Sequence, residues 1–278
     1  MTNYLTDKVI IVTGAAAGFG KLVSQRAAAL GAKIVASDID AAGLDTLIAE
    51  LTAARHTAVG VQADVSDREQ MIALSAKAVA TFGRIDILLN NAGIMPLAFY
   101  ADHADAAAAW DKCIDINFRG VLNGITAVHD QMLEQGQGHV INMSSIYGNA
   151  PVAGAGVYGA TKAAVNFLSE SLRVESQGKI KVTIMKPTGV PGTALGAGII
   201  NPAALAGILG ANYEGYLEKF MSMLGGELDE TSTNPENIGY FALEPEFVAE
   251  QILYAMNQPW GVSIGELTVR SAGESYVI

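Results

Sequence analysis

Cysteine is almost absent from this chain. Cys113 is the only cysteine among 278 residues, so neither an intramolecular disulfide nor a cysteine-based zinc site can form. Freedom from disulfides is typical of a reducing compartment, and we expect a cytoplasmic location. The histidines lack the spacing of metal ligands, so we expect no metal site; they are His56, His103, His129 and His139.

Charged residues are also scarce, and basic ones especially so. Charged residues make up 16% of the chain, and 17 Lys and Arg against 28 Asp and Glu give a net charge of −11. A protein that binds a phosphate backbone needs a basic surface, which this composition does not supply. We therefore expect no nucleic-acid partner.

No segment has the pattern of an export signal or a membrane span. The N-terminus, MTNYLTDKVIIVTG, has no basic region and enters a β-branched run almost at once. Residues 187–213 carry no charge, but their prolines, their glycines and Asn201 are unsuited to a spanning helix. We interpret this segment as an apolar loop or lid and expect no membrane partner.

What the chain does have is a regular alternation of two patterns. Short β-branched runs predict strands at Val9–Thr13, Ile34–Ser37, Ala58–Ala63, Ile87–Asn90, Val140–Met143, Val182–Met185 and Leu267–Val269. The segments between them predict helices near Gly20–Leu30, Ala42–Ala53, Arg68–Phe82, Ala104–Ile125, Val157–Ser176 and Pro245–Met256.

Strands that alternate with helices of this length predict an α/β fold with a doubly wound parallel sheet, the Rossmann fold. The chain is 50% hydrophobic and no linker divides it, so we expect residues 1–278 to form one domain. Residues 188–237 show no regular pattern. An irregular segment of this length is either functional or wrongly assigned.

A glycine-rich stretch, TGAAAGFGK, follows the first predicted strand. Gly14, Gly18 and Gly20 then lie between a strand and a helix, where glycine lets backbone N–H groups approach a pyrophosphate. The GK pair resembles part of a nucleoside-triphosphate P-loop, but Leu22 replaces the required Ser or Thr and Ala15 replaces the first glycine. We therefore expect a dinucleotide.

An acidic residue ends the second predicted strand. Asp38 follows Gly20 by 18 residues, about where a carboxylate that binds the adenosine ribose is expected. Its charge would repel a 2′-phosphate, so NAD is favoured, although Lys21 is close enough to keep NADP possible. Taken alone, Asp38 is also consistent with a solvated strand end.

A tyrosine and a lysine lie four residues apart in VYGATKAA, residues 157–164. On a helix, Tyr158 and Lys162 leave from the same face, among neighbours small enough to let a ligand approach. An ammonium near a phenol favours the phenolate, so the pair suits acid/base chemistry. Taken alone, the pair favours an ordinary surface contact over apolar side chains, and the rest of the chain has to change that interpretation.

Four motifs together resemble one known family. The chain is similar to the short single-domain branch of the short-chain dehydrogenase/reductases over roughly residues 7–190. The motifs that carry the resemblance occur in the family's order and spacing; they are TGAAAGFG at 13–20, NNAG at 90–93, NMSSIYG at 142–148 and YGATK at 158–162.

The resemblance implies a catalytic set of Asn117, Ser145, Tyr158 and Lys162. Tyr158 would be the general acid/base at the alcohol or carbonyl oxygen. Lys162 would lower the pKa of Tyr158 and hold the nicotinamide ribose. Ser145 would hydrogen-bond the substrate oxygen, and Asn117 would support a proton relay through water and Lys162.

The resemblance also implies which residues contact the cofactor. Asp64 and Val65 would flank the adenine ring, and the NNAG motif would lie beside the dinucleotide. The complete expected cofactor-binding set is Gly14, Gly18, Phe19, Gly20, Asp38, Asp64, Val65, Asn91, Ala92, Gly93, Tyr158, Lys162, Pro187 and Val190.

The loop after the sixth predicted strand departs from the family pattern. In KPTGVPGTAL, Pro187 and Val190 fit, but Thr188 replaces the expected glycine. Gly192 stands where the family has a threonine that contacts the nicotinamide amide, and Thr193 comes one residue late. We therefore expect a rebuilt loop.

The resemblance also implies that residues 188–237 form an extended substrate lid, and the apolar character of this lid bears on the substrate. Leucine, isoleucine, tyrosine and methionine recur through residues 194–237, and Met95, Pro96, Tyr147 and Val152 are expected nearby. This composition favours a bulky hydrophobic alcohol or ketone, such as an aryl, alicyclic or steroid-like one.

The leading hypothesis is thus an NAD-dependent oxidoreductase that acts on a secondary alcohol or ketone. An NADPH-preferring carbonyl reductase is one alternative. A non-catalytic dinucleotide sensor is another, disfavoured because Ser145, Tyr158 and Lys162 are all present. The resemblance also implies a homo-oligomer, either a tetramer or a dimer.

Overall fold

One parallel sheet organises the molecule. The computed structural model describes residues 2–191 and 193–278. Its seven strands lie in the order β3-β2-β1-β4-β5-β6-β7, and every neighbouring pair is parallel. The strands are β1 (Val9–Thr13), β2 (Lys33–Asp38), β3 (Ala58–Gln62), β4 (Ile87–Asn90), β5 (Gly138–Met143), β6 (Ile180–Pro187) and β7 (Glu266–Val269).

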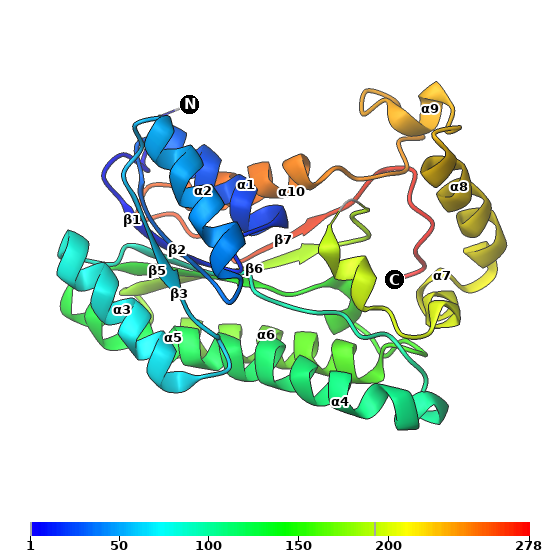
Figure 1. The fold of residues 1–278 in the computed structure, drawn as a ribbon, viewed down its shortest axis with the longest axis horizontal. Helices are drawn as coiled ribbons and strands as arrows, with labels where there is room; N and C mark the ends of the chain where they lie inside the picture. Colours follow the sequence, from blue (N-terminus) through cyan, green and yellow to red (C-terminus); the bar gives the residue numbers. More distant parts are fainter. Residues whose placement is uncertain (1, 192) are drawn as a thin grey trace.

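Helices cover both faces of this sheet (Figure 1). One face carries α1 (Gly18–Ala29), α2 (Ala41–Ala53) and α10 (Pro245–Met256), and the other carries α3 (Arg68–Phe82), α5 (Gly120–Glu134) and α6 (Gly156–Glu175). Along β1, Ile10 and Val12 pack into the first core while Val9 and Ile11 pack into the second. The alternation of side chains along a strand thus supplies two cores, which confirms the doubly wound α/β fold.

The seven predicted strands are confirmed, and one helix prediction is wrong in its extent. The helix predicted over Ala104–Ile125 is α4 (His103–Ile114), a π-helical turn at Asp115–Arg119, and then α5, which continues to Glu134. Its last two turns carry Val128 and Met132 into the core. Gly136, with a φ of +74°, follows the helix and turns the chain toward β5.

The segment predicted to be irregular contains helices. After Pro187 come the 3₁₀ turns Ala194–Gly198, Pro202–Leu205 and Gly210–Asn212, with α7 (Ala206–Leu209), α8 (Tyr213–Gly225) and α9 (Glu230–Thr233). Gly226 ends α8 in the left-handed conformation. In Figure 1, α7, α8 and α9 stand together beyond one end of the sheet, next to the C-terminus. No helix among the described residues is both long and apolar enough to cross a membrane.

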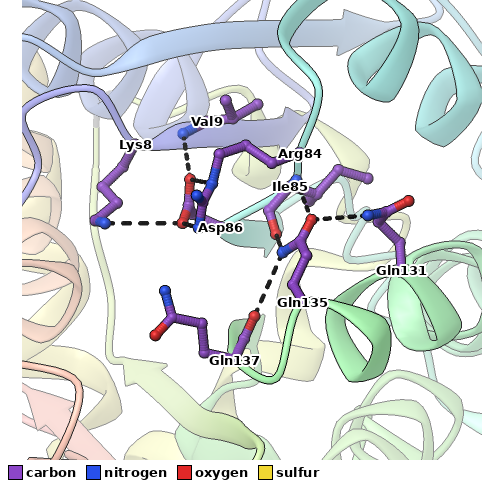
Figure 2. A network of polar contacts seen from close by, with 8 residues as sticks. All are labelled: Lys8, Val9, Arg84, Ile85, Asp86, Gln131, Gln135 and Gln137. Carbon is purple, nitrogen blue, oxygen red and sulfur yellow. Dashed lines mark hydrogen bonds and ion pairs between the residues drawn. The ribbon is translucent and has the colours of Figure 1, made fainter.

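A buried carboxylate joins the strands at the opposite, amino-terminal end of the sheet (Figure 2). Asp86 has an exposed fraction of 0% and accepts hydrogen bonds from the backbone N–H of Val9 at 2.9 Å and from Arg84 Nε at 2.9 Å. The guanidinium of Arg84 also donates to the second oxygen of Asp86 at 2.7 Å, and the Lys8 ammonium lies 3.8 Å away. The charge is therefore fully compensated, and it links the start of β1 to β4.

We expect Asp86→Ala to destabilise the fold strongly, because it strands the Val9 N–H and leaves Arg84 without its acceptor. Leaving the buried Val9 N–H without an acceptor costs about 1–3 kcal/mol, whereas the Arg84 side chain is 41% exposed and can bind water instead. Urea denaturation should show this loss in the free energy of unfolding. The exposed Asp45→Ala on α2 is the control and should change it by no more than about 0.5 kcal/mol. Equal midpoints for the two variants would contradict the role of Asp86.

A buried histidine lies between β5 and β6. The Thr183 hydroxyl donates to the Ile264 carbonyl at 2.6 Å, so it accepts the Nε2–H of His139 at 2.8 Å. This leaves His139 Nδ1 as an acceptor with no hydrogen-bond partner among the described residues. Burial, helped by the nearby Lys181, lowers the pKa of His139 to about 3.

This histidine should make the fold sensitive to acid. An unfolded chain binds the proton near pH 6.5 and the folded protein only near pH 3, so the free energy of unfolding falls as the pH drops between these values. From pH 7 to pH 4.5 we expect the wild type to lose about 2–3 kcal/mol more than His139→Gln. Urea denaturation of both proteins at the two pH values measures this difference. Parallel losses would contradict it.

Candidate active site

The carboxyl end of β1 leads into a tight glycine turn. Gly14 and Gly18 have φ values of +64° and +52°, which glycine adopts without strain. A Cβ on Gly20 would lie 2.1 Å from the Gly14 carbonyl oxygen, so α1 packs directly against the turn. A Cβ on Gly18 would meet nothing within 4 Å, so the space in front of the turn is open. The N-terminus of α1 faces a place where an anion can approach the backbone.

Asp38 stands beside this turn, at the end of β2. Its carboxylate accepts the backbone N–H of Ala16 at 2.9 Å and that of Asp40 at 3.0 Å. These bonds hold the carboxylate against the glycine turn. Lys21 does not pair with Asp38; its ammonium bonds Glu50 on α2 at 2.8 Å.

The end of β4 closes the other side of the turn. The Asn91 amide donates to the carbonyl oxygens of Thr13 and Gly14, both at 2.9 Å. Asn91 thus holds the β1 and β4 loops together at the point where the strand order reverses. In open parallel sheets, ligands bind at this switch point.

Ser145, Tyr158 and Lys162 meet at the ends of β5 and α6. Lys162 Nζ donates to the Met143 carbonyl at 2.8 Å and lies 5.7 Å from the centroid of the Tyr158 ring. Ser145 lies close enough to the Tyr158 hydroxyl to lower the pKa of that phenol. The tyrosine and lysine are 3% and 6% exposed, so the pair is buried and is not a surface contact.

Burial controls the protonation of this pair. It raises the pKa of Tyr158 well above that of a free phenol, and the nearby Ser145 opposes the rise only in part. Burial also lowers the pKa of Lys162 to about 8. At neutral pH the protein alone therefore holds a neutral phenol beside a lysine that remains charged but loses its proton readily.

Asn117 occupies the π-helical turn between α4 and α5. Its amide pairs with the backbone of Ile94 twice: Oδ1 accepts the N–H at 2.9 Å and Nδ2 donates to the carbonyl at 2.8 Å. A Cβ on Gly93 would lie 3.3 Å from Asn117 Oδ1 and 3.7 Å from Lys162 Nζ. Such π turns often occur at functional sites. Here the turn aims a buried amide at the loop that follows β4.

These groups surround one cavity of about 950 Å³. Most of the predicted residues line it, namely Ser145, Tyr158, Lys162, Gly14, Gly18, Phe19, Asp38, Asp64, Val65, Asn91, Ala92, Gly93, Pro187 and Val190. Gly20 and Asn117 do not. Both are buried behind the wall, where Gly20 permits close packing and Asn117 holds Ile94.

The apolar side of the cavity comes from the segment after β6. Leu195, Ile199, Leu205, Ile208, Tyr216, Phe220, Met223 and Leu224 line it, as do Met95 and Tyr147. Pro96 and Val152, also expected near the pocket, do not. Thr188 and Thr193 of the altered loop are lining residues, whereas Gly192 lies outside the described residues.

Sequence reasoning missed one wall of the cavity. Tyr276, two residues from the C-terminus, lines it and packs against Gly189, where a Cβ would meet the tyrosine hydroxyl. Tyr276 belongs to no motif and lies far from the altered loop in the sequence, so nothing in the sequence indicated that the two are in contact. Among the described residues, no group of three His, Cys, Asp or Glu side chains could hold a metal ion.

Comparisons with known proteins agree with this geometry. A family model described as short chain dehydrogenase matches residues 8–201. An uncharacterized oxidoreductase of Staphylococcus saprophyticus is 32% identical over 274 residues, which cover 98% of this chain and 99% of that protein.

Two solved structures extend the likeness. The closed form of a serine dehydrogenase complexed with NADP+ is 31% identical with a TM-score of 0.77, and the match covers 97% of each chain. A short-chain dehydrogenase/reductase from Burkholderia phymatum in complex with NAD is 25% identical with a TM-score of 0.75, covering 96% of this chain and 90% of that one. The chain therefore belongs to the short-chain dehydrogenase/reductase family and is an oxidoreductase.

Proposed function

We propose that this protein transfers hydride between NAD and a hydrophobic secondary alcohol or ketone, with Tyr158 as the general acid/base. One observation carries the proposal. Tyr158, Ser145 and Lys162 meet at the point where the glycine-lined part of the cavity joins its apolar part. A reacting carbon at this junction would lie between a cofactor site and a substrate site.

The residues present fit a dinucleotide. The open space before Gly18 and the α1 N-terminus suit a pyrophosphate, Asp38 suits the adenosine ribose, and Asp64 and Val65 suit the adenine. Lys162 would hold the nicotinamide ribose, with Pro187 and Val190 beside the nicotinamide. A nicotinamide dinucleotide bound there supplies the hydride acceptor or donor and, when oxidised, a positive charge.

The protein's own residues would transfer the proton to and from the substrate oxygen. In ketone reduction, the neutral phenol of Tyr158 donates its proton to the substrate oxygen as negative charge develops there. Ser145 donates a second hydrogen bond to that oxygen and fixes its position. In alcohol oxidation, Tyr158 would first lose its proton to solvent, and the Lys162 ammonium would stabilise the phenolate. The phenolate would then take the hydroxyl proton of the alcohol as hydride leaves the carbon for the oxidised dinucleotide. Asn117 would hold the loop beside Lys162 in place through Ile94.

The cavity supports a hydrophobic substrate. The segment after β6, which we propose is a substrate lid, contributes aliphatic and aromatic walls, and α8 lays Tyr216, Phe220 and Met223 along them. An aryl, alicyclic or steroid-like alcohol or ketone would bury its apolar surface here, and a small polyol would not.

NAD is the proposed cofactor, with NADP as the alternative. Of the two solved relatives described above, one is in complex with NAD and the other with NADP+, so the choice between these cofactors depends on this chain's own residues. Asp38 places a carboxylate beside the ribose position, and the ammonium of Lys21, which could favour a 2′-phosphate, is bound to Glu50. Both features support NAD over an NADPH-preferring reductase.

We also propose that the protein is a cytoplasmic homo-oligomer, a tetramer or a dimer. Large apolar side chains lie exposed on α6, which carries Tyr158 and Lys162, and at the end of α4, next to the turn that carries Asn117. Their exposed fractions are 78% for Phe167, 62% for Val174 and 41% for Ile114. Exposed apolar side chains grouped on such elements support an interface between copies.

Tyr158→Phe should abolish turnover while cofactor binding survives. The change removes only the hydroxyl, and loss of a general acid/base lowers kcat by about 10²–10⁴-fold. Steady-state rates with an aryl ketone and fluorescence titration with NADH measure the two effects. Tyr254→Phe, at an exposed position on α10, is the matched control and should keep both. Undiminished turnover in Tyr158→Phe would refute the acid/base role, and no turnover by the wild type despite cofactor binding would favour a dinucleotide sensor.

Asp38→Asn should narrow the preference for NAD. Asparagine keeps an acceptor for the Ala16 N–H but removes the charge that repels a 2′-phosphate. At an effective dielectric constant of about 20, this repulsion is worth more than about 1.4 kcal/mol. The ratio of kcat/KM with NAD to that with NADP should therefore fall at least about tenfold, and Asp45→Asn should leave it unchanged. A wild type that prefers NADP would refute the assignment.

A further inference from the structure

Three phenol rings continue from Tyr158 into the apolar part of the cavity. The rings of Tyr147 and Tyr158 meet edge to face with centroids 5.5 Å apart, and those of Tyr216 and Tyr276 lie 6.0 Å apart. Tyr147 and Tyr216 are close enough for each to raise the pKa of a neighbouring phenol in this group. All three line the cavity that Tyr158 lines. We call Tyr147, Tyr216 and Tyr276 the distal phenol cluster.

Hydrogen bonds to the C-terminal segment hold Tyr276 in this position. The backbone around it is fixed on both sides: Val277 N–H donates to the Ile208 carbonyl at 3.0 Å, and Asn212 Nδ2 donates to the Ser275 carbonyl at 2.9 Å. Figure 1 shows this C-terminal segment in red, ending near α7. Tyr276 is thereby held between α7 and the loop after β6, where its hydroxyl packs on Gly189.

The cluster offers hydrogen bonds without charge. Burial raises the pKa of Tyr147, Tyr216 and Tyr276, so all three remain neutral phenols at physiological pH. No arginine of the described residues lines the cavity. Two lysines do: Lys162, which is bound to the Met143 carbonyl, and Lys112 on α4, an element that carries none of the three phenols. A carboxylate would meet no cation at the cluster, whereas an uncharged oxygen could exchange hydrogen bonds with the phenols.

We propose that the distal phenol cluster binds a second, uncharged oxygen of the substrate. The substrate class is then a hydrophobic ketone or secondary alcohol that carries another hydroxyl or carbonyl group, separated from the reacting carbon by an apolar skeleton. Tyr276 is the specificity-determining residue, because it lies in both the cluster and the wall beside the altered loop. This assignment rests on the proposed function, since the reacting carbon must lie at Tyr158.

A matched pair of ketones tests the assignment. The probes are 4-(4-hydroxyphenyl)butan-2-one and 4-phenylbutan-2-one, which differ by one phenolic oxygen far from the carbonyl. The wild type should prefer the hydroxylated ketone by about 5–10-fold in kcat/KM, the value of one neutral hydrogen bond. Tyr276→Phe should remove most of this preference by lowering kcat/KM for the hydroxylated ketone alone.

Tyr213→Phe is the control for packing. Tyr213 begins α8 and packs in the same region, but it does not line the cavity. Tyr213→Phe should leave kcat/KM for each ketone, and the ratio of the two values, unchanged. If Tyr276→Phe lowers kcat/KM equally for the two ketones, Tyr276 only supports the fold. If it lowers kcat/KM for neither ketone, Tyr276 does not contact the substrate. Either result overturns the assignment.

The same measurements separate this assignment from the proposed function. If the wild type reduces both ketones at equal rates, the distal oxygen site is wrong and the ketone reductase activity stands. If it reduces neither ketone and oxidises neither corresponding alcohol, the proposed function fails first. Calorimetric titration of the protein with each ketone, in the presence of NAD, then tests the distal site without turnover: tighter binding of the hydroxylated ketone, lost in Tyr276→Phe, supports it, and equal binding overturns it.

Discussion

The site depends on the hydrogen bond that the buried Lys162 ammonium donates to the Met143 carbonyl. This bond joins α6 to the end of β5, and it lies beside both Tyr158 and Gly93. A charge in such a place is unfavourable unless every neighbour is arranged around it. The small residues of α6, the glycine of the β4 loop and the π turn at Asn117 supply that arrangement. The helix and the loops are consequently fixed relative to one another before any ligand binds.

Parallel strands extend this order across the sheet. Because β1, β4, β5 and β6 all end at one edge, the groups that their loops carry converge there although they lie far apart in the sequence. Asn91 shows how closely the loops depend on each other, since one amide bonds two carbonyls of the β1 turn. The amino-terminal edge has the opposite character. There, Asp86 and Gln135 satisfy backbone groups of the strands and loops, so the polar side chains hold the sheet together.

The fold and most of the site residues were predictable because both depend on local pattern. Strands show as β-branched runs, the glycine turn follows a strand, and Tyr158 and Lys162 are one helical turn apart. Contacts between distant segments were not predictable. Nothing in GESY indicates that Tyr276 lies against Gly189, and the helices of residues 194–237 were missed because their apolar residues contact the cavity as well as one core. Lys21 stayed ambiguous for the same reason, since only the structure brings Glu50 beside it.

This division has a physical cause that bears on specificity. The residues around Lys162 tolerate little change, because each one compensates a buried charge or fills the space left by a glycine. The walls built by α7, α8 and the C-terminal segment are held by backbone hydrogen bonds and apolar packing, which many side chains can satisfy. On the proposed function, substrate choice would reside in the part of the chain whose packing many side chains can satisfy, and the proton chemistry in the part whose packing few can satisfy. Tyr147 lies between the two parts, because its neighbours are Tyr158 on one side and Tyr216 of the distal phenol cluster on the other.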